Sequence, residues 1–315
     1  MILVMSKSLI CFSGILIITH CFNRPDFIEW QYRCFKRFLH DEYEYVVFND
    51  AQDLTLEKKI NEICNLLGVR SIRIPQINRV RPKDSPLTLS SWRHSQAIRF
   101  SMEQLGFSHD GIVMLIDSDM FLIKDFCVED FLQNYDIAGI QQIRGGTYLW
   151  PGLIFFRMNN LPNKETMNFN PTCVQNIWND TGGALHHYFQ ENQSIKILFF
   201  EQKYRMFLDN DLMVYTWSSQ LTRIRQYCSC SSCVKIGCPC RHNRKILEEL
   251  NFDKKILNCL ELKQVPPAIE FVLNDTFFHY VASSNWDKKD DEFHKHKTFL
   301  FLNFINSMIA YEIEL

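Results

Sequence analysis

Short apolar runs alternate with longer amphipathic segments over the first two thirds of the chain. Apolar runs of about four to eight residues between turn residues are typical of buried strands, and longer stretches with apolar positions at helical spacing are typical of helices. Because strands that alternate with helices form parallel sheets, the pattern predicts an α/β fold with a mostly parallel, Rossmann-like sheet and helices on both faces. The predicted strands are Gly14–Thr19, Tyr43–Phe48, Val69–Ile74 and Gly111–Ile116, and the predicted helices are Phe27–Leu39, Leu54–Leu67 and Ser90–Leu105.

A different pattern follows in the second half of the chain. Asp136–Ile143 and Tyr148–Arg157 flank the turn Arg144-Gly145-Gly146, and two apolar runs joined by a glycine-containing turn predict a β-hairpin. The paired glycines suggest that the turn needs backbone freedom that other residues lack. Further along, the sequence predicts a helix near Gly183–Glu191, a strand near Glu270–Leu273 and a terminal helix over Phe299–Tyr311.

Composition favours one domain over several. The 315 residues are 46% hydrophobic, which is enough to bury a substantial core. With only 11 Gly and 10 Pro and no internal repeat, no segment resembles a linker. We therefore expect residues 1–315 to form a single domain with insertions.

Charge and the N-terminal segment limit the expected partners and location. Lys and Arg number 34 against 36 Asp and Glu, so no net positive field attracts a polyanion, and a nucleic-acid partner is not expected. The longest uninterrupted apolar run near the N-terminus, Gly14–Ile18, is far shorter than the roughly 20 residues that span a bilayer. Its β-branched isoleucines are followed by the turn-like Asn23-Arg24-Pro25, which favours a buried strand. We expect a cytoplasmic protein without a transmembrane segment.

An acidic motif, Asp117-Ser118-Asp119, follows the most apolar predicted strand, Gly111–Ile116. In a parallel sheet this position is at the carboxyl end of the strand, where α/β folds bind their ligands. Two carboxylates that face one point repel each other unless a cation joins them. Oxygen ligands suit Mg²⁺ or Mn²⁺, and such an ion would act as a Lewis acid toward a departing diphosphate.

Two other interpretations of the acidic motif stay open. An Asp-x-Asp sequence at a strand end is also found in turns that cap a helix. A phosphatase of the haloacid dehalogenase type also has two Asp residues after an apolar strand, the first as nucleophile. That family usually has Thr or Val two residues beyond the second Asp and the motif near its N-terminus, whereas here Phe121 occupies that position and three predicted strands come first. The phosphatase interpretation is therefore the weaker one.

Several short motifs are spread over most of the chain. They are Asn23-Arg24-Pro25, Ser91-Trp92-Arg93-His94-Ser95-Gln96-Ala97, IVMLIDSDMFL around the acidic pair, YLWPGLIFFRMNNLP, Asp180-Thr181-Gly182-Gly183, Phe278-His279-Tyr280 and Ser284-Asn285-Trp286. This ordered set resembles the GT-A glycosyltransferases, including uncharacterised ones of large DNA viruses and some bacteria. The resemblance implies a GT-A fold and transfer of a sugar from a nucleotide-sugar donor to an acceptor hydroxyl. The acceptor, whether glycan, protein or lipid, is not identified by the sequence.

The resemblance also implies roles for the residues that match the motifs. In GT-A enzymes the first Asp of the acidic motif contacts the donor ribose or the metal and the second binds the metal, so Asp117 and Asp119 take these roles, with Mn²⁺ or Mg²⁺ as cofactor. A late histidine often completes the metal shell, and His279 matches it. An isolated histidine in an apolar run is otherwise a core side chain.

Five further positions are candidates for the donor and acceptor sites, each with a structural alternative. Asp50 ends the second predicted strand and would bind the base or ribose, or cap the next turn. Arg93 and His94 would face the diphosphate, or lie on a solvated helix face. Gly152 would let the backbone approach the sugar, or form a strand bulge. Asp180 would receive the acceptor hydroxyl proton or orient the acceptor, or cap a helix.

A cysteine-rich insertion at residues 226–243 departs from the usual GT-A pattern. Its thiols are those of Cys228, Cys230, Cys233, Cys238 and Cys240. They can supply the four soft ligands of a structural Zn²⁺, although the spacing is not that of a common zinc finger. The thiols would otherwise belong to a reduced loop, or form a disulfide in an oxidising compartment. Basic residues surround the thiols, so the alternative is a zinc knuckle that binds nucleic acid or protein on an inactive scaffold. We rank this alternative below the transferase because it does not explain the acidic motif.

Overall fold

The computed structural model describes residues 14–76, 81–200, 202–208, 211–214, 268–273, 276–280 and 291–310. The chain divides into two compact units. The first unit contains Met1–Met120 and Asp125–Phe200, and the second contains Phe121–Lys124 and Glu201–Leu315.

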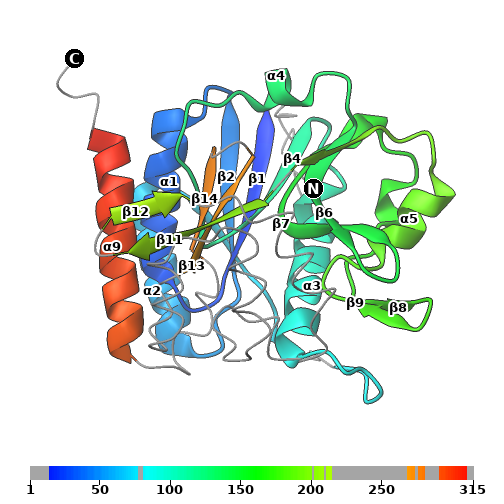
Figure 1. Cartoon of the computed structure of the whole chain (residues 1–315), viewed down its shortest axis with the longest axis horizontal. Helices are drawn as coiled ribbons and strands as arrows, with labels where there is room; N and C mark the ends of the chain where they lie inside the picture. Colours follow the sequence, from blue (N-terminus) through cyan, green and yellow to red (C-terminus); the bar gives the residue numbers. More distant parts are fainter. Residues whose placement is uncertain are drawn as a thin grey trace, which may run out of the picture. The chain divides into compact units, whose positions relative to one another are not determined.

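A seven-stranded sheet forms the centre of the first unit (Figure 1). Its strands, in order across the sheet, are β10 (Ile197–Phe200), β6 (Ile137–Ile143), β7 (Thr147–Arg157), β4 (Ile112–Asp117), β1 (Ile15–Cys21), β2 (Tyr43–Asn49) and β3 (Arg70–Arg73). Neighbouring strands are parallel except on the two sides of β7, which runs antiparallel to both β4 and β6. The predicted mostly parallel sheet is therefore confirmed.

Helices join the parallel strands and cover both faces of this sheet. The crossovers are α1 (Pro25–Phe38), α2 (Leu54–Leu67) and α3 (Leu89–Ser101). Tyr45 of β2 packs edge-on against Phe35 of α1, with 5.3 Å between the ring centroids. Phe48, three residues further along β2 and so on the opposite face, packs against Phe100 of α3 at 6.1 Å. The predicted helices on both faces are present.

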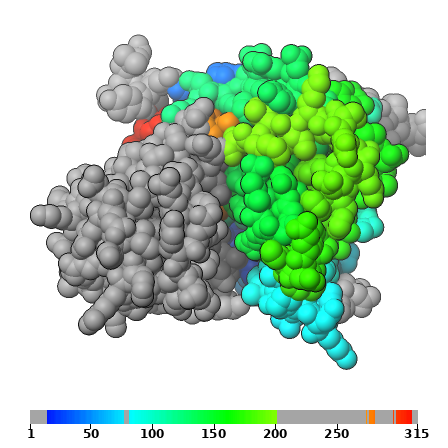
Figure 2. All heavy atoms as spheres, turned by 45° about the vertical axis from the view of Figure 1, so that its right-hand side comes forward, coloured from blue at the N-terminus to red at the C-terminus, as the bar shows by residue number. Residues whose placement is uncertain are grey.

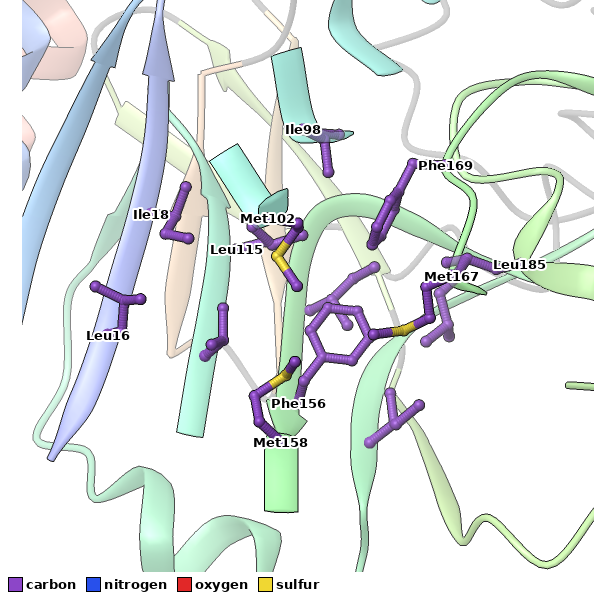
Figure 3. Packing of buried hydrophobic residues seen from close by; sticks show 14 of the residues in the cluster. Leu16, Ile18, Ile98, Met102, Leu115, Phe156, Met158, Met167, Phe169 and Leu185 are labelled. Atoms are coloured by element: carbon purple, nitrogen blue, oxygen red, sulfur yellow. The ribbon is translucent and has the colours of Figure 1, made fainter. Parts of the chain in front are cut away.

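The main hydrophobic cluster lies on the α3 side of the sheet (Figure 3). Leu16, Ile18 and Leu115 of neighbouring strands contribute to it together with Met102 and Phe156. Leu16 and Ile18 alternate with residues that face α1, as the period of two along a strand requires. The continuous apolar run of β4 is explained by burial on both faces, because all residues from Ile112 to Ile116 are buried.

Both ends of α2 follow from its sequence. The side chain of Asp53 accepts a hydrogen bond from the backbone N–H of Leu56 at 2.9 Å. At the other end Gly68 adopts the left-handed conformation, with φ of 67°, as expected for a helix that closes on glycine.

Replacing Asp53 by alanine is expected to lower the free energy of unfolding by about 1 kcal/mol, because the N-terminal N–H of α2 loses its acceptor. Urea denaturation measures the change. Glu62→Ala on the same helix is the control. Glu62 forms an exposed ion pair with Lys58, and its replacement should change the free energy of unfolding by less than about 0.5 kcal/mol. Equal losses in the two variants would contradict the capping role.

The hairpin of β6 and β7 is present as predicted, but the reason for its glycines differs. Among the described glycines, positive φ occurs at Gly68 and Gly182 and not in this turn. A Cβ on Gly145 would lie 2.1 Å from the carbonyl oxygen of Val174, and one on Gly146 would lie 2.6 Å from Nδ1 of His186. Close approach of neighbouring segments, not backbone freedom, requires glycine here.

Other elements of the first unit differ in extent from the prediction. The helix α3 ends at Ser101 and continues as a π-helical turn over Met102–Gly106. The helix α5 (Leu185–Glu191) was predicted, whereas the small hairpin of β8 (Thr172–Val174) and β9 (Ile177–Asn179) was not. The residues 81–88 that lead into α3 are mostly exposed and extend from the rest of the first unit as the cyan segment of Figures 1 and 2.

The second unit contains a five-stranded sheet and a long helix. Its strands, in order, are β12 (Asp211–Val214), β11 (Gln202–Leu208), β13 (Ala268–Val272), β14 (Phe277–His279) and β5 (Met120–Leu122). The helix α9 (Asp291–Ala310) begins eight residues before the predicted Phe299. Phe301 of α9 stacks on Phe278 of β14, with centroids 4.7 Å apart.

Two sequence predictions concern membranes and cysteines. No helix in the described part of the chain combines the length and the apolar character needed to cross a membrane. The cysteine-rich insertion 226–243, with Cys228, Cys230, Cys233, Cys238 and Cys240, lies outside the described residues.

Candidate active site

The carboxyl edge of the central sheet gathers most of the predicted site residues of the first unit. From β1 the strand order continues through β2 and β3 on one side and through β4 on the other, so it reverses between β1 and β4. Open α/β sheets bind ligands outside the carboxyl ends of the strands at such a reversal. His20 near the end of β1 lies in register with Asp117, the last residue of β4. The topology therefore places the acidic motif where a ligand is expected.

Asp117 and Asp119 lie close together at this edge. A carboxylate oxygen of Asp117 is within 4.8 Å of one of Asp119, and Asp119 is only 7% exposed. Two carboxylates at this distance, one of them buried, repel each other unless a cation offsets their charge. Their hard oxygen atoms are the donors that Mg²⁺ and Mn²⁺ prefer. The donor set fits a divalent ion.

His94 of α3 contacts the first of these carboxylates. Its Nε2 lies 3.2 Å from Oδ1 of Asp117. Burial acts to lower the pKa of His94, but the hydrogen bond and charge of Asp117, with the charges of Asp50 and Asp119, outweigh burial and raise the pKa above its ordinary value. The charges of three carboxylates thus act on this one imidazole.

Asp50 and Arg93 form a second polar group at the carboxyl end of β2. Arg93 Nε donates to Oδ2 of Asp50 at 3.0 Å, and Nη2 donates to the backbone oxygen of Asp50 and to Oε1 of Gln76. Gln76 Nε2 in turn donates to Oδ1 of Asp50 at 3.1 Å. The guanidinium lies 4.4 Å from the centre of the Phe22 ring. The fork of Arg93 is therefore engaged by protein acceptors, and it holds Asp50 in place.

An open hollow adjoins this polar group. It has a volume of about 380 Å³ and is lined by Gln52, Gln76, Leu89 and Arg93. Ligand pockets in proteins start at roughly 300 Å³. The volume of the hollow is therefore within the range of ligand pockets.

Gly152 lies next to the acidic motif in the sheet. Ile116 of β4 pairs with Leu153 of β7, so the antiparallel register places Gly152 across from Asp117. On its other side β7 is irregular, because Gly139 pairs with Ile154 while Ile140 pairs with Trp150. A Cβ on Gly152 would lie 2.2 Å from the ring of Trp150. The strand bulge that was the alternative for Gly152 is thus present, beside the candidate site.

The loop that contains Asp180 contacts both β7 and α3. Gly182 has φ of 86°, and a Cβ there would lie 2.4 Å from the carbonyl oxygen of Leu149. Oγ1 of Thr181 donates to the backbone oxygen of Ser91 at 3.0 Å. Oδ1 of Asp180 accepts from the N–H of Thr181 at 2.7 Å. Because α5 begins at Leu185 after Ala184, Asp180 is not its N-cap.

Sequence reasoning missed three polar residues that hold these groups. Gln76 binds Asp50, Thr181 ties its loop to α3, and Gln31 of α1 contacts the turn of the acidic motif. Only Gln31 had a sequence signal, since it is a lone polar residue in the apolar stripe of an amphipathic helix. The other two depend on tertiary contacts that no spacing reveals.

His279 belongs to the second unit. It ends β14, where its neighbours Phe277, Phe278 and Tyr280 are fully buried, and it is itself 5% exposed. Burial agrees both with a core histidine and with a metal ligand.

Comparisons with known proteins found likeness only among solved structures. No protein-family profile matches the sequence, and no curated protein matches it. A mannosyltransferase of Pyrobaculum calidifontis, solved with GDP-Man and Mn²⁺, is 10% identical with a TM-score of 0.38 and covers 60% of this chain and 55% of its own. TarS of S. aureus is 15% identical with a TM-score of 0.33, and the match covers 49% of this chain and 30% of TarS. The bifunctional glycosyltransferase WbbM is 14% identical with a TM-score of 0.31, and the match covers 47% of this chain and 32% of WbbM.

All three similarities are weak. Each TM-score is below 0.5, and the aligned part spans 55% or less of each of these proteins. A function for this chain must therefore be inferred from its own residues.

Proposed function

We propose that this chain is a GT-A type glycosyltransferase that uses Mn²⁺ or Mg²⁺ to transfer a sugar from a nucleotide-sugar donor to an acceptor hydroxyl. One observation carries the proposal: the carboxylates of Asp117 and Asp119 lie within 4.8 Å of each other at the reversal point of a mostly parallel sheet. A divalent ion bound there would offset the charge that develops on the departing nucleoside diphosphate.

The residues around the acidic pair would orient the donor. Asp50 is fixed by Arg93 and Gln76, which both line the hollow, and it would bind the base or ribose. His94 of α3 would hold Asp117 in position, and it would donate a hydrogen bond to a phosphate oxygen of the donor. At Gly152, across from Asp117, the backbone would approach the sugar closely, while the Trp150 ring fills the space that a Cβ would need.

Asp180 would act on the acceptor. Its loop packs against β7 near Gly152 and is tied to α3, so the carboxylate is held at the same edge as the acidic pair. There it would orient the acceptor hydroxyl or, in an inverting enzyme, receive its proton.

His279 would supply a further metal ligand. It ends β14, the neighbour of β5 in the five-stranded sheet, and β5 begins at Met120, directly after Asp119 in the chain. A neutral imidazole completes an oxygen-rich shell of Mn²⁺ well. Both units would then belong to one transferase domain.

Two further predictions rest on the sequence alone. They are a structural Zn²⁺ in the insertion 226–243 and a cytoplasmic location.

Replacing Arg93 by lysine is expected to raise the donor KM about tenfold while leaving Mn²⁺ affinity unchanged. Lysine keeps the charge but cannot hold the Oδ2 and backbone oxygen of Asp50 together. Steady-state kinetics with the preferred nucleotide sugar measures the effect. Arg99→Lys on the same helix is the matched control, because Arg99 forms an exposed ion pair with Glu103. A similar KM change in both variants would contradict the role of Arg93.

A hydrolysis screen tests the proposed function. The purified full chain is incubated with a panel of nucleotide sugars and Mn²⁺, and release of the nucleoside diphosphate is measured before and after addition of a chelator. The proposal predicts metal-dependent release from at least one donor. Release from none, or release that is indifferent to the chelator, would contradict it. Cleavage of phosphomonoesters alone would favour the phosphatase alternative.

A further inference from the structure

One buried amide side chain sits within the apolar stripe of α1. Gln31 is fully buried, and its neighbours on the stripe include Phe27, Ile28, Cys34 and Phe35. Burying an amide costs free energy unless its donors and acceptor are paired. A glutamine at this position must therefore have specific partners.

Those partners lie on the turn of the acidic motif and on β2. Nε2 of Gln31 donates to the backbone oxygen of Asp117 at 3.0 Å and to that of Met120 at 2.7 Å. Oε1 accepts from the hydroxyl of Tyr45 at 2.7 Å. The reverse orientation of the amide would turn Oε1 toward two carbonyl oxygens, so these contacts define the orientation.

Tyr45 keeps the amide in this orientation. The residue is 5% exposed, and burial raises the pKa of its hydroxyl well above the ordinary value, so it remains a donor. Its ring is fixed against Phe35 of α1. Tyr45 and Gln31 thus form a rigid buried link from β2 through α1 to the acidic turn.

The two carbonyls that Gln31 binds stand at the two ends of the turn that contains Ser118 and Asp119. The directions of the Asp117 and Asp119 side chains depend on the backbone between these carbonyls. We infer, on the basis of the proposed function, that Gln31 is a positioning residue that fixes this turn so that both carboxylates reach one divalent ion. Groups that orient metal ligands without touching the metal commonly change its affinity 10- to 100-fold when replaced.

The inference is tested by the affinity for Mn²⁺ alone, measured on the full chain by electron paramagnetic resonance of the free ion. Gln31→Met has a similar length and no amide, so it leaves the two carbonyls without their donor. We expect its Kd for Mn²⁺ to rise about tenfold or more. Tyr45→Phe removes only the link to Oε1, and we expect a smaller rise of about threefold.

Tyr188→Phe is the matched control. The Tyr188 hydroxyl, on a residue that is 3% exposed, donates to the backbone oxygen of Pro162 at 2.7 Å, so this variant also loses one hydrogen bond of the first unit. Its thermal midpoint should fall about as much as that of Tyr45→Phe, while its Kd for Mn²⁺ stays that of the wild type.

Each outcome decides between the inference and the proposed function. If the wild type binds no Mn²⁺, the proposed metal site fails. If the wild type binds Mn²⁺ and folded Gln31→Met binds it equally well, the inference is overturned while the metal site stands. If Gln31→Met does not fold, Tyr45→Phe decides, and a Kd equal to that of Tyr188→Phe would overturn the inference.

Discussion

Asp119→Asn is expected to lower kcat/KM for the nucleotide sugar about 10³-fold. Asparagine keeps the size of the side chain but replaces a charged oxygen ligand by a neutral amide beside Asp117. A metal ion stabilises the departing diphosphate by several kcal/mol, and about 4 kcal/mol corresponds to a 10³-fold change in rate. Turnover of the donor identified in the screen measures the effect at saturating Mn²⁺.

The control and the companion variant separate metal loss from other causes. Asp125→Asn removes the charge of an exposed carboxylate that pairs with Arg37, and it should leave kcat/KM within about twofold of the wild type. Asp117→Asn should resemble Asp119→Asn, because both carboxylates serve one ion. Full phosphatase activity in Asp119→Asn together with none in Asp117→Asn would instead identify Asp117 as a nucleophile and reject the transferase.

Gly182→Ala is expected to lower the free energy of unfolding by about 3 kcal/mol. A non-glycine residue at φ of 86° costs about 1–2 kcal/mol, and its Cβ would lie 2.4 Å from the backbone oxygen of Leu149, so the backbone itself must move. The loop of Asp180 would shift away from β7, and we expect kcat/KM to fall about tenfold at a temperature where the variant is folded. Urea denaturation and kinetics measure the two effects.

Gly68→Ala is the matched control for this substitution. Gly68 has φ of 67°, and no atom of the described residues, its two chain neighbours aside, lies within 4 Å of an added Cβ. Only the backbone strain remains, so we expect a loss of about 1 kcal/mol and unchanged activity. Equal destabilisation of the two variants would contradict the close packing of the Asp180 loop against β7. Full activity in Gly182→Ala would contradict the claim that the site requires this packing.

Much of the first unit could be predicted from sequence because its signals are local. The helix Leu54–Leu67 has the predicted bounds, since Asp53 and Gly68 mark its ends through side-chain capping and the left-handed conformation. The strand before Asp117 was recognisable because burial on both faces requires a continuous apolar run. The proximity of Asp117 and Asp119 followed from their spacing and their place after that strand.

The parts that were missed depend on contacts between distant segments. The contact of Arg93 with Asp50 was not predicted, because Asp50 is 43 residues away in the chain and cannot be deduced from helix spacing. The glycines of the β6–β7 turn were ascribed to backbone freedom because the segments that approach them were not recognised: the hairpin of β8 and β9 at Gly145 and His186 of α5 at Gly146. Strands of three residues leave almost no periodic signal.

The most direct test of the account is a Mn²⁺ titration of the full chain and of the double variant Asp117→Asn/Asp119→Asn, followed by electron paramagnetic resonance. The account predicts that the wild type binds Mn²⁺ at a site from which Mg²⁺ displaces it, and that the double variant loses this binding while keeping the thermal midpoint of a folded protein. Equal Mn²⁺ binding by both proteins, or none by the wild type, would contradict the claim that the two carboxylates hold a divalent ion.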